Sequence, residues 1–303
     1  MADRIRKRTV FLKKVNFEHP KPNVTFEQYV RDTISIMGGV LPDYEKDFFL
    51  KMHCSDLSVS DNDGIFLYFT QTFEGSETST VNKQNIGDRS VSTIQAPTGQ
   101  DFLEQDLSVL IYKDNLITCS SGLSSSALLN YFYQVFKKSN LDNEVGVFGI
   151  TNVAHTDQLK LIEDVGVKNI DLDVQTYLAT FEEIKGTPEK NFLKTLFKKE
   201  DPYIARHKEN MRARIILNPK KGLSKFSRDD MQIPLKRLAH SIVEDHDDEY
   251  KITLENGATL SPNDIKVHEK ISLPAFGNSV DHKNVWQELK RIFEKYKNDQ
   301  SII

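Results

Sequence analysis

The sequence predicts an α+β protein. Apolar–polar alternation typical of strands occurs in several runs, including Thr9–Val15 and Val167–Val174. Helical periodicity bounded by capping residues occurs between such runs, as in Thr25–Met37. No period of 20–50 residues recurs, which argues against a repeat array. Strands and helices therefore mix along 303 residues, a length that suits one large or two ordinary domains.

We expect a first α+β domain at residues 1–142. Thr25 is a predicted N-cap, and Gly38-Gly39 stops the helix that follows it. The polar stretch Gly75–Gln100 predicts a mobile loop or short irregular strands. The other expected elements, in chain order, are a strand at Thr9–Val15, a turn at Ser60–Gly64 followed by a strand, a hairpin turning at Lys113–Asn115, and a helix from about Ser124 to Lys138.

The serine-rich stretch "CSSGLSSSALL" precedes this last helix and suggests three kinds of site. It lacks the second glycine of a GxSxG nucleophile turn and the lysine of a phosphate-binding P-loop. A hydroxyl among Ser124–Ser126 that accepts from a free backbone N–H would cap the helix. We therefore interpret these serines as structural, with anion binding at the helix start and catalysis as the alternatives.

A second α+β domain is expected at residues 143–303. Asn256-Gly257 is the strongest hairpin signal in the chain. The last helix, His282–Lys297, must bury Val285, Leu289 and Phe293, and it is expected to pack back on the first domain. The other expected elements are strands at 144–150, Val167–Val174, 211–219 and 265–273, and helices at 155–166, 175–184, 188–199 and 233–246.

The cysteine content and the lack of long apolar runs limit the kinds of protein that this sequence can encode. The two cysteines, Cys54 and Cys119, form no CxxC pair and no disulfide framework, which favours a reducing compartment. No apolar run approaches the roughly 18 residues of a membrane span, and the basic N-terminus has no signal-peptide core. We expect a soluble, cytoplasmic protein without a cofactor.

The net charge of −4 hides a strong asymmetry. The segment Lys185–Arg228, the basic segment below, holds 13 Lys and Arg against four acids; its net charge is +9 and that of the rest is −13. Like charges at i, i+4 on a helix repel, and an anionic partner removes that cost. The predicted contacts to the phosphates of duplex DNA lie on a helix, a strand and a loop of this segment: Lys190, Lys194, Lys198, Lys199, Arg212, Arg214, Lys220, Lys221 and Lys225.

An acidic cluster at Glu244–Lys251, "EDHDDEYK", supports the alternative function. Asp245, His246 and Asp247 are of types that bind metals, and Glu249-x-Lys251 is similar to the end of a Mg²⁺-dependent nuclease motif. The run also lies between a helix and a hairpin, where a solvated connection needs no metal. We predict no metal or catalytic residue, and keep a metal-dependent nuclease or toxin as the alternative.

A wider pattern resembles the RexA family of phage-exclusion proteins. It consists of "DLSVLIYKDNLITCSSGLSSSALLNYF", "VGVKNIDLDV", the basic helix, "ARIILNPKKG" and a final charged helix, and it covers Phe102 to Lys297. The resemblance implies a homodimeric, two-domain DNA-binding protein in bacterial anti-phage defence, with a membrane-protein partner. The chain departs from it in a longer N-terminal half and in the polar stretch Gly75–Gln100.

Overall fold

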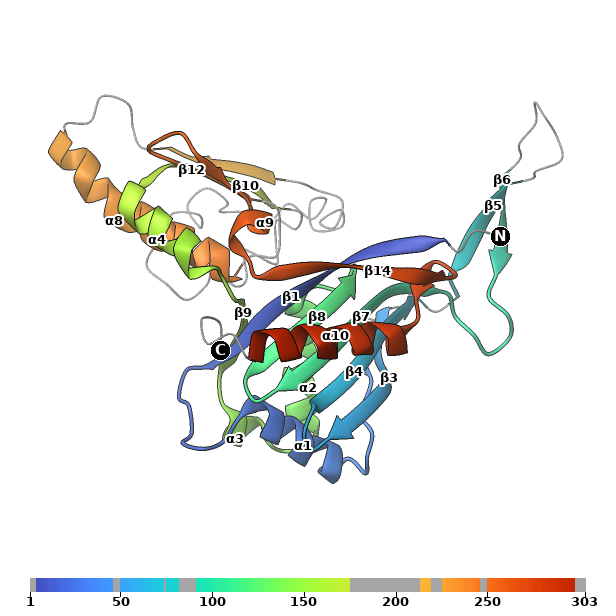
Figure 1. Cartoon of the computed structure of the whole chain (residues 1–303). Coiled ribbons are helices and arrows are strands. Elements are labelled where there is room, and N and C mark those ends of the chain that lie inside the picture. The colour runs from blue at the N-terminus through green and yellow to red at the C-terminus, as the bar shows by residue number, and fades with distance from the viewer. Residues whose placement is uncertain are drawn as a thin grey trace, which may run out of the picture. The chain divides into compact units, whose positions relative to one another are not determined.

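The structure is a computed structural model that describes residues 4–45, 50–73, 75–81, 91–174, 213–218, 225–245 and 250–297 (Figure 1). Its helices and antiparallel sheets confirm the predicted α+β class. Contacts divide the chain into unit 1, Met1–Val153 with Val267–Ile303, and unit 2, Ala154–Lys266. The division expected at residues 142/143 would place β9 (Phe148–Asn152) in the second part. In the structure β9 pairs with the first strand, so unit 1 continues past it.

A nine-stranded antiparallel sheet forms the centre of unit 1. The strand β1 (Ile5–Phe17) is long enough to pair with β14 at its start, with β8 in its middle and with β9 at its end. The strand order is β15 (Ser279–Val280), β14 (His268–Phe276), β1, β8 (Asn115–Ser121), β7 (Leu103–Tyr112), β4 (Gly64–Phe73), β3 (Leu50–Ser60) and β2 (Tyr44–Glu45), with β9 beside β1.

Two helices cover one face of this sheet. Thr25 caps α1 (Phe26–Ile36), as predicted, by accepting from the Gln28 N–H. α2 (Ser125–Lys138) packs beside it and leads into the short helix α3 (Asp142–Val145). The Phe26 ring meets the Phe132 ring edge to face at 4.9 Å between centroids, a favoured aromatic geometry. Both helices therefore bury their apolar stripes in one aromatic-rich core.

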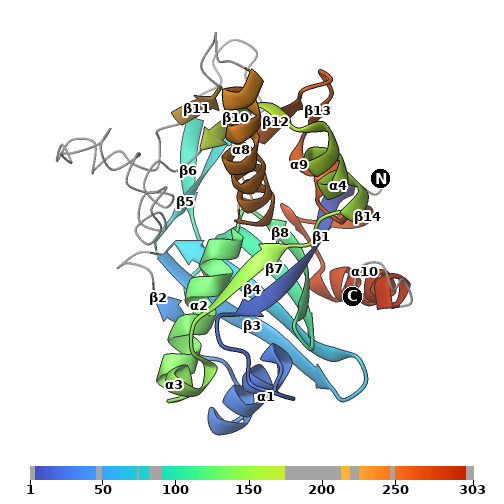
Figure 2. The ribbon, with the colours of Figure 1, turned by 90° about the vertical axis from the view of Figure 1, so that its left-hand side faces the viewer.

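The last helix, α10 (His282–Lys297), covers the opposite face (Figure 2). Its bounds match the prediction, and the residues predicted to face inward are all buried, namely Val285, Leu289, Ile292 and Phe293. They pack with residues of β1, β4, β7 and β8 in a second core. The C-terminal helix thus belongs to unit 1, although unit 2 separates it from most of that unit in the sequence.

The polar stretch Gly75–Gln100 contains a two-stranded ribbon. β5 (Glu77–Val81) pairs with β6 (Val91–Gln95), and Figure 1 shows this ribbon extending beyond the ends of β4 and β7. Its described side chains are mostly exposed on both faces. The prediction of short strands is confirmed here. Their pairing was not foreseen, because neither strand has the alternation that a buried face produces.

Unit 2 is a smaller two-layer unit. Its sheet has the order β11 (Ala213–Leu217), β10 (Val167–Val174), β12 (Tyr250–Leu254) and β13 (Thr259–Leu260). α4 (Thr156–Val165) and α8 (Lys225–Asp245) share a core with these strands, and α9 (Pro262–Ile265) closes it. Asn256-Gly257 forms the predicted turn, where Asn256 Oδ1 accepts from the Ala258 N–H at 2.9 Å.

The helix α8 begins earlier than predicted, at Lys225, and contains Pro234. Proline favours the first turn of a helix, so the sequence pointed to a start at Ile233. In the structure Gln232 anchors the preceding turn, because its side-chain amide both accepts from the Val167 N–H and donates to the Val167 carbonyl. Gly166, at φ +85°, allows this approach: a Cβ there would lie 2.7 Å from Gln232 Oε1.

Candidate functional site

The predicted phosphate contacts lie mostly outside the described residues. This holds for Lys190, Lys194, Lys198, Lys199, Arg212, Lys220 and Lys221. The backbone positions of Arg214 and Lys225 are described: Arg214 lies in β11, and Lys225 is the first residue of α8. The geometry of the predicted DNA-binding surface is therefore described only at its strand and at the start of α8.

The strand β11 is an edge strand of the unit 2 sheet, and its backbone register with β10 is described. Arg214 is opposite Asp173, while Asp171 is opposite both Ile216 and Lys251. Directly opposite residues of an antiparallel pair share a face. Lys251 and Ile216 are exposed there, on the face away from the α4–α8 core. The side chains described at these positions on this face are those of Asp171, Ile216 and Lys251, which are one acid, one apolar residue and one base.

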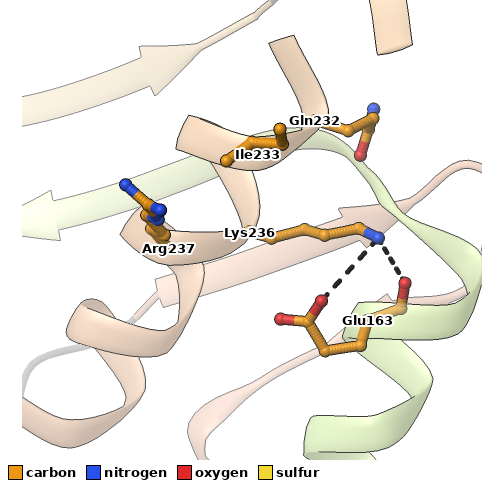
Figure 3. Close-up of a pocket in the computed structure, with 5 residues that line it drawn as sticks. All are labelled: Glu163, Gln232, Ile233, Lys236 and Arg237. Carbon is orange, nitrogen blue, oxygen red and sulfur yellow. Dashed lines mark hydrogen bonds and ion pairs between the residues drawn. The ribbon is translucent and has the colours of Figure 1, made fainter. Parts of the chain in front are cut away.

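A shallow hollow of about 320 Å³ lies between α4 and α8 (Figure 3). Lys236 extends across it to Glu163 of α4: its Nζ donates to the Glu163 carbonyl and lies 3.8 Å from Oε2. His240 Nε2 lies 2.8 Å from the other carboxylate oxygen. The acid of this hollow is therefore already paired with two basic side chains that join the two helices.

The serine-rich turn is a helix cap, as predicted. Ser124 Oγ accepts from the Ala127 N–H at 3.2 Å, and Gly122 makes the preceding turn at φ +100°. Ser120 donates to the Leu123 carbonyl. Ser121 Oγ accepts from Arg8 Nη1 at 2.8 Å. A guanidinium group is a donor only, so this pairing does not activate Ser121 as a nucleophile.

Arg8 belongs to a polar group on the α10 side of the sheet, which we call the Arg8 site: Arg8, Asp106, Ser121 and Ser279. Asp106 is only 6% exposed, and one of its oxygens accepts from the Ser279 hydroxyl. Burial raises the pKa of Asp106, while the Ser279 hydrogen bond and the charge of Arg8 oppose the shift. The Nε and Nη2 atoms of Arg8 are buried, and they have no hydrogen-bond partner among the described residues.

The first turn of α10 adds an aromatic and charged cluster on the same face. The rings of His282 and Tyr68 stack at 4.4 Å, and His282 Nε2 lies 2.8 Å from Asp56 Oδ2. Lys283 Nζ also contacts Asp56, at 2.6 Å, and lies over the Trp286 ring. Burial raises the pKa of Asp56, but the hydrogen bonds from Lys283 and His282 outweigh it, and the net shift is downward. Asp56 is thus held as a carboxylate that fixes the start of α10.

Burial raises the pKa of Tyr68 to about 12, with the charge of Asp106 adding to the shift and that of Arg8 opposing it. Tyr68 therefore keeps its hydroxyl proton at neutral pH, and it is near enough to the Arg8 site to respond to the charges there.

The acidic cluster Glu244–Lys251 is only partly described. Residues 246–249 lie outside the described ranges, and Lys251 is an exposed residue of β12. Across the described ranges, no group of three or more His, Cys, Asp or Glu residues is arranged to hold a metal ion. The nuclease alternative therefore stays a prediction. Likewise, no described helix is long and apolar enough to cross a membrane.

The Arg8 site was not predicted from the sequence. A signal was present in "RIRKRTVFL", where Arg6, Arg8, Val10 and Leu12 alternate on one strand face. Nothing local indicated that Asp106 and Ser279 would join them, because the pairing of β1 with β8, of β8 with β7 and of β14 with β15 brings these residues together. Neither a family model nor a curated protein matches this chain.

Proposed function

We propose that this protein binds duplex DNA through the basic segment Lys185–Arg228, without base-sequence preference and without catalysis. The observation that supports this proposal is the charge asymmetry, +9 in the basic segment against −13 in the rest. A concentrated positive field attracts a polyanion, while the acidic remainder repels it, so DNA is confined to one surface.

The contacts are to phosphates rather than to base edges. The basic residues follow an i, i+4 pattern in 188–199 and alternate at Arg212 and Arg214 in the strand predicted at 211–219, with no Asn, Gln and Arg set typical of base recognition. If about six of them each neutralise a phosphate, log K falls against log[salt] with a slope of about −5.

The biological setting follows from the RexA resemblance. We propose a cytoplasmic homodimer that acts as sensor or effector in anti-phage defence, together with a membrane protein encoded alongside. Light scattering tests the dimer: the resemblance implies twice the chain mass of 34.8 kDa, and a concentration-independent 34.8 kDa would contradict it.

The test of DNA binding is a duplex titration at low and physiological salt. The Arg212→Glu, Arg214→Glu variant is expected to bind more weakly for every base sequence. Its matched control is Lys7→Glu, Lys14→Glu, which makes the same change in net charge at two exposed residues of β1. Because Asp173 lies opposite Arg214, an Arg212→Gln, Arg214→Gln variant also avoids placing two acids in register.

Two outcomes would overturn the proposal. If wild type fails to bind duplex DNA at low salt, the nucleic-acid function is wrong. If the folded Arg212 and Arg214 variants bind as tightly as wild type, the basic segment is not the contact surface. Incubation of plasmid with Mg²⁺ separates the alternative function, since cleavage that stops on mutation of Asp245 and Asp247 would establish a nuclease.

A further inference from the structure

Arg8 has two hydrogen-bond donors that the described chain does not use. Its Nη1 donates to Ser121, whereas Nε and Nη2 are buried without a partner. Nε–H and an N–H of Nη2 point in the same direction and form one edge of the guanidinium plane. This edge matches two oxygens of a carboxylate or phosphate, the strongest geometry available to arginine.

A guanidinium edge whose two donors are buried without partners lowers the stability of a folded protein. Donors of a buried charged group that lack partners destabilise a folded protein, so such groups are normally paired or bound to a ligand. The charge of Arg8 opposes the rise that burial causes in the pKa of Asp106, yet the two side chains form no ion pair among the described contacts. Arg6, two residues earlier on the same strand face, also has a buried Nε without a described partner. Two arginines of β1 thus keep buried donors that have no partner among the described residues.

We propose that the Arg8 site binds a phosphate group, with Nε and Nη2 of Arg8 donating to two of its oxygens. The ligand is a small phosphate compound, either inorganic phosphate or a phosphate monoester. This site lies in unit 1, apart from the basic segment in the sequence, and the inference goes beyond the proposed DNA binding.

The acid Asp106 favours a phosphate ligand over a carboxylate ligand. A carboxylate ligand brings only acceptor oxygens and would meet Asp106 as a like charge. A phosphate monoester has a second pKa near 6, so it also presents an O–H that an ionised Asp106 can accept. Ser121, whose oxygen accepts from Arg8, adds a hydroxyl donor. The site therefore offers donors to several oxygens and one acceptor to a proton.

The affinity for phosphate is expected to rise at lower pH. Binding an anion beside Asp106 is easier when either partner carries the shared proton, so affinity for phosphate rises as pH falls from about 7.5 to 6. The charged or titratable groups around Asp106 are Arg8 from β1, Tyr68 from β4 and Cys119 from β8, with Asp281 and His282 at the start of α10. Asp106→Asn removes the acid and is expected to flatten this dependence.

The experiment measures binding of inorganic phosphate and of a nucleoside monophosphate to the full chain by calorimetry, with sulfate as a probe that carries no proton. Arg8→Gln is expected to weaken phosphate binding about tenfold or more, because two charge-assisted hydrogen bonds are lost. Arg8→Lys keeps the charge without the fork and is expected to weaken it similarly. The control is Lys7→Gln, because Lys7 is an exposed cation that directly precedes Arg8 in β1. This variant is expected to change the affinity for phosphate by less than about twofold.

Two further arms decide between sources of phosphate. If the site serves a small molecule, Arg8→Gln leaves duplex DNA binding unchanged, and the Arg212 and Arg214 variants leave phosphate binding unchanged. If Arg8→Gln abolishes DNA binding but wild type binds neither small phosphate, the ligand is the nucleic-acid backbone and the proposal is wrong. It is equally wrong if wild type binds none of the probes, or if sulfate binds as tightly as phosphate at pH 6. Should Arg8→Gln not fold, Arg8→Lys and Asp106→Asn decide.

Discussion

The packing of the last helix, α10, in the core of unit 1 allows a quantitative prediction for Leu289→Ala. Leu289 lies in the middle of α10, is fully buried, and packs in the core that α10 shares with the sheet. Truncation removes roughly three carbon groups, worth about 2.4 kcal/mol at 0.8 kcal/mol each. An unfilled cavity adds to this cost, and buried Leu→Ala changes typically lie between about 2 and 5 kcal/mol. We therefore expect a loss of about 3 kcal/mol.

The chain contains its own reporter for this loss. Trp286 is the only tryptophan, is 7% exposed, and packs on Phe66 in the core of unit 1. Its fluorescence therefore follows the unfolding of unit 1 and not that of unit 2. For a domain of about 150–250 residues, 3 kcal/mol corresponds to a fall in Tm of about 6–12 °C.

Gln287→Ala is the matched control, since Gln287 is an exposed neighbour on the same helix. Its Tm is expected to stay within about 2 °C of wild type, because surface substitutions rarely exceed 0.5 kcal/mol. If Leu289→Ala shifts the tryptophan transition no more than Gln287→Ala does, α10 is not part of the unit 1 core. The reasoning from burial would then fail for this helix.

The remaining predictions concern the serine cap and the cysteines. Ser124→Ala is expected to destabilise unit 1 by about 1 kcal/mol through the lost bond to Ala127, whereas Ser126→Ala, an exposed change in the same turn, is expected to be nearly neutral; equal effects in denaturant titrations would rule out the cap. Burial raises the pKa of both Cys54 and Cys119 to about 12, so both thiols stay protonated at pH 8. A thiol reagent is therefore expected to react slowly with the folded protein and fully after unfolding, and rapid reaction of two thiols in the native state would contradict this burial.

Local chemistry explains why many elements could be predicted from the sequence. The helix at His282–Lys297 follows from apolar spacing near 3.6 residues, and Asp281 caps it by accepting from the N–H groups of Lys283 and Asn284. The turn at Asn256-Gly257 follows from residues that tolerate positive φ. Such signals involve neighbours within four residues, so one sequence contains them completely.

Strand pairing could not be predicted in this way. β3, Leu50–Ser60, was not predicted, and its pairing with β4 includes a bulge between Cys54 and Asp56 that breaks the alternation. The early start of α8 depends on Gln232 bonding to Val167, a contact across 65 residues. These elements are stabilised by distant partners that no local pattern identifies.

The sequence by itself determined the α+β class, the caps and turns, the inward face of the last helix and the concentration of positive charge in Lys185–Arg228. Only the tertiary structure decided that α10 completes unit 1 and that Arg8 lies beside Asp106 with two donors unused. The physical reason is the separation along the chain of the residues that interact. Periodicity and capping act within a few residues, whereas burial and charge pairing depend on which strands become neighbours.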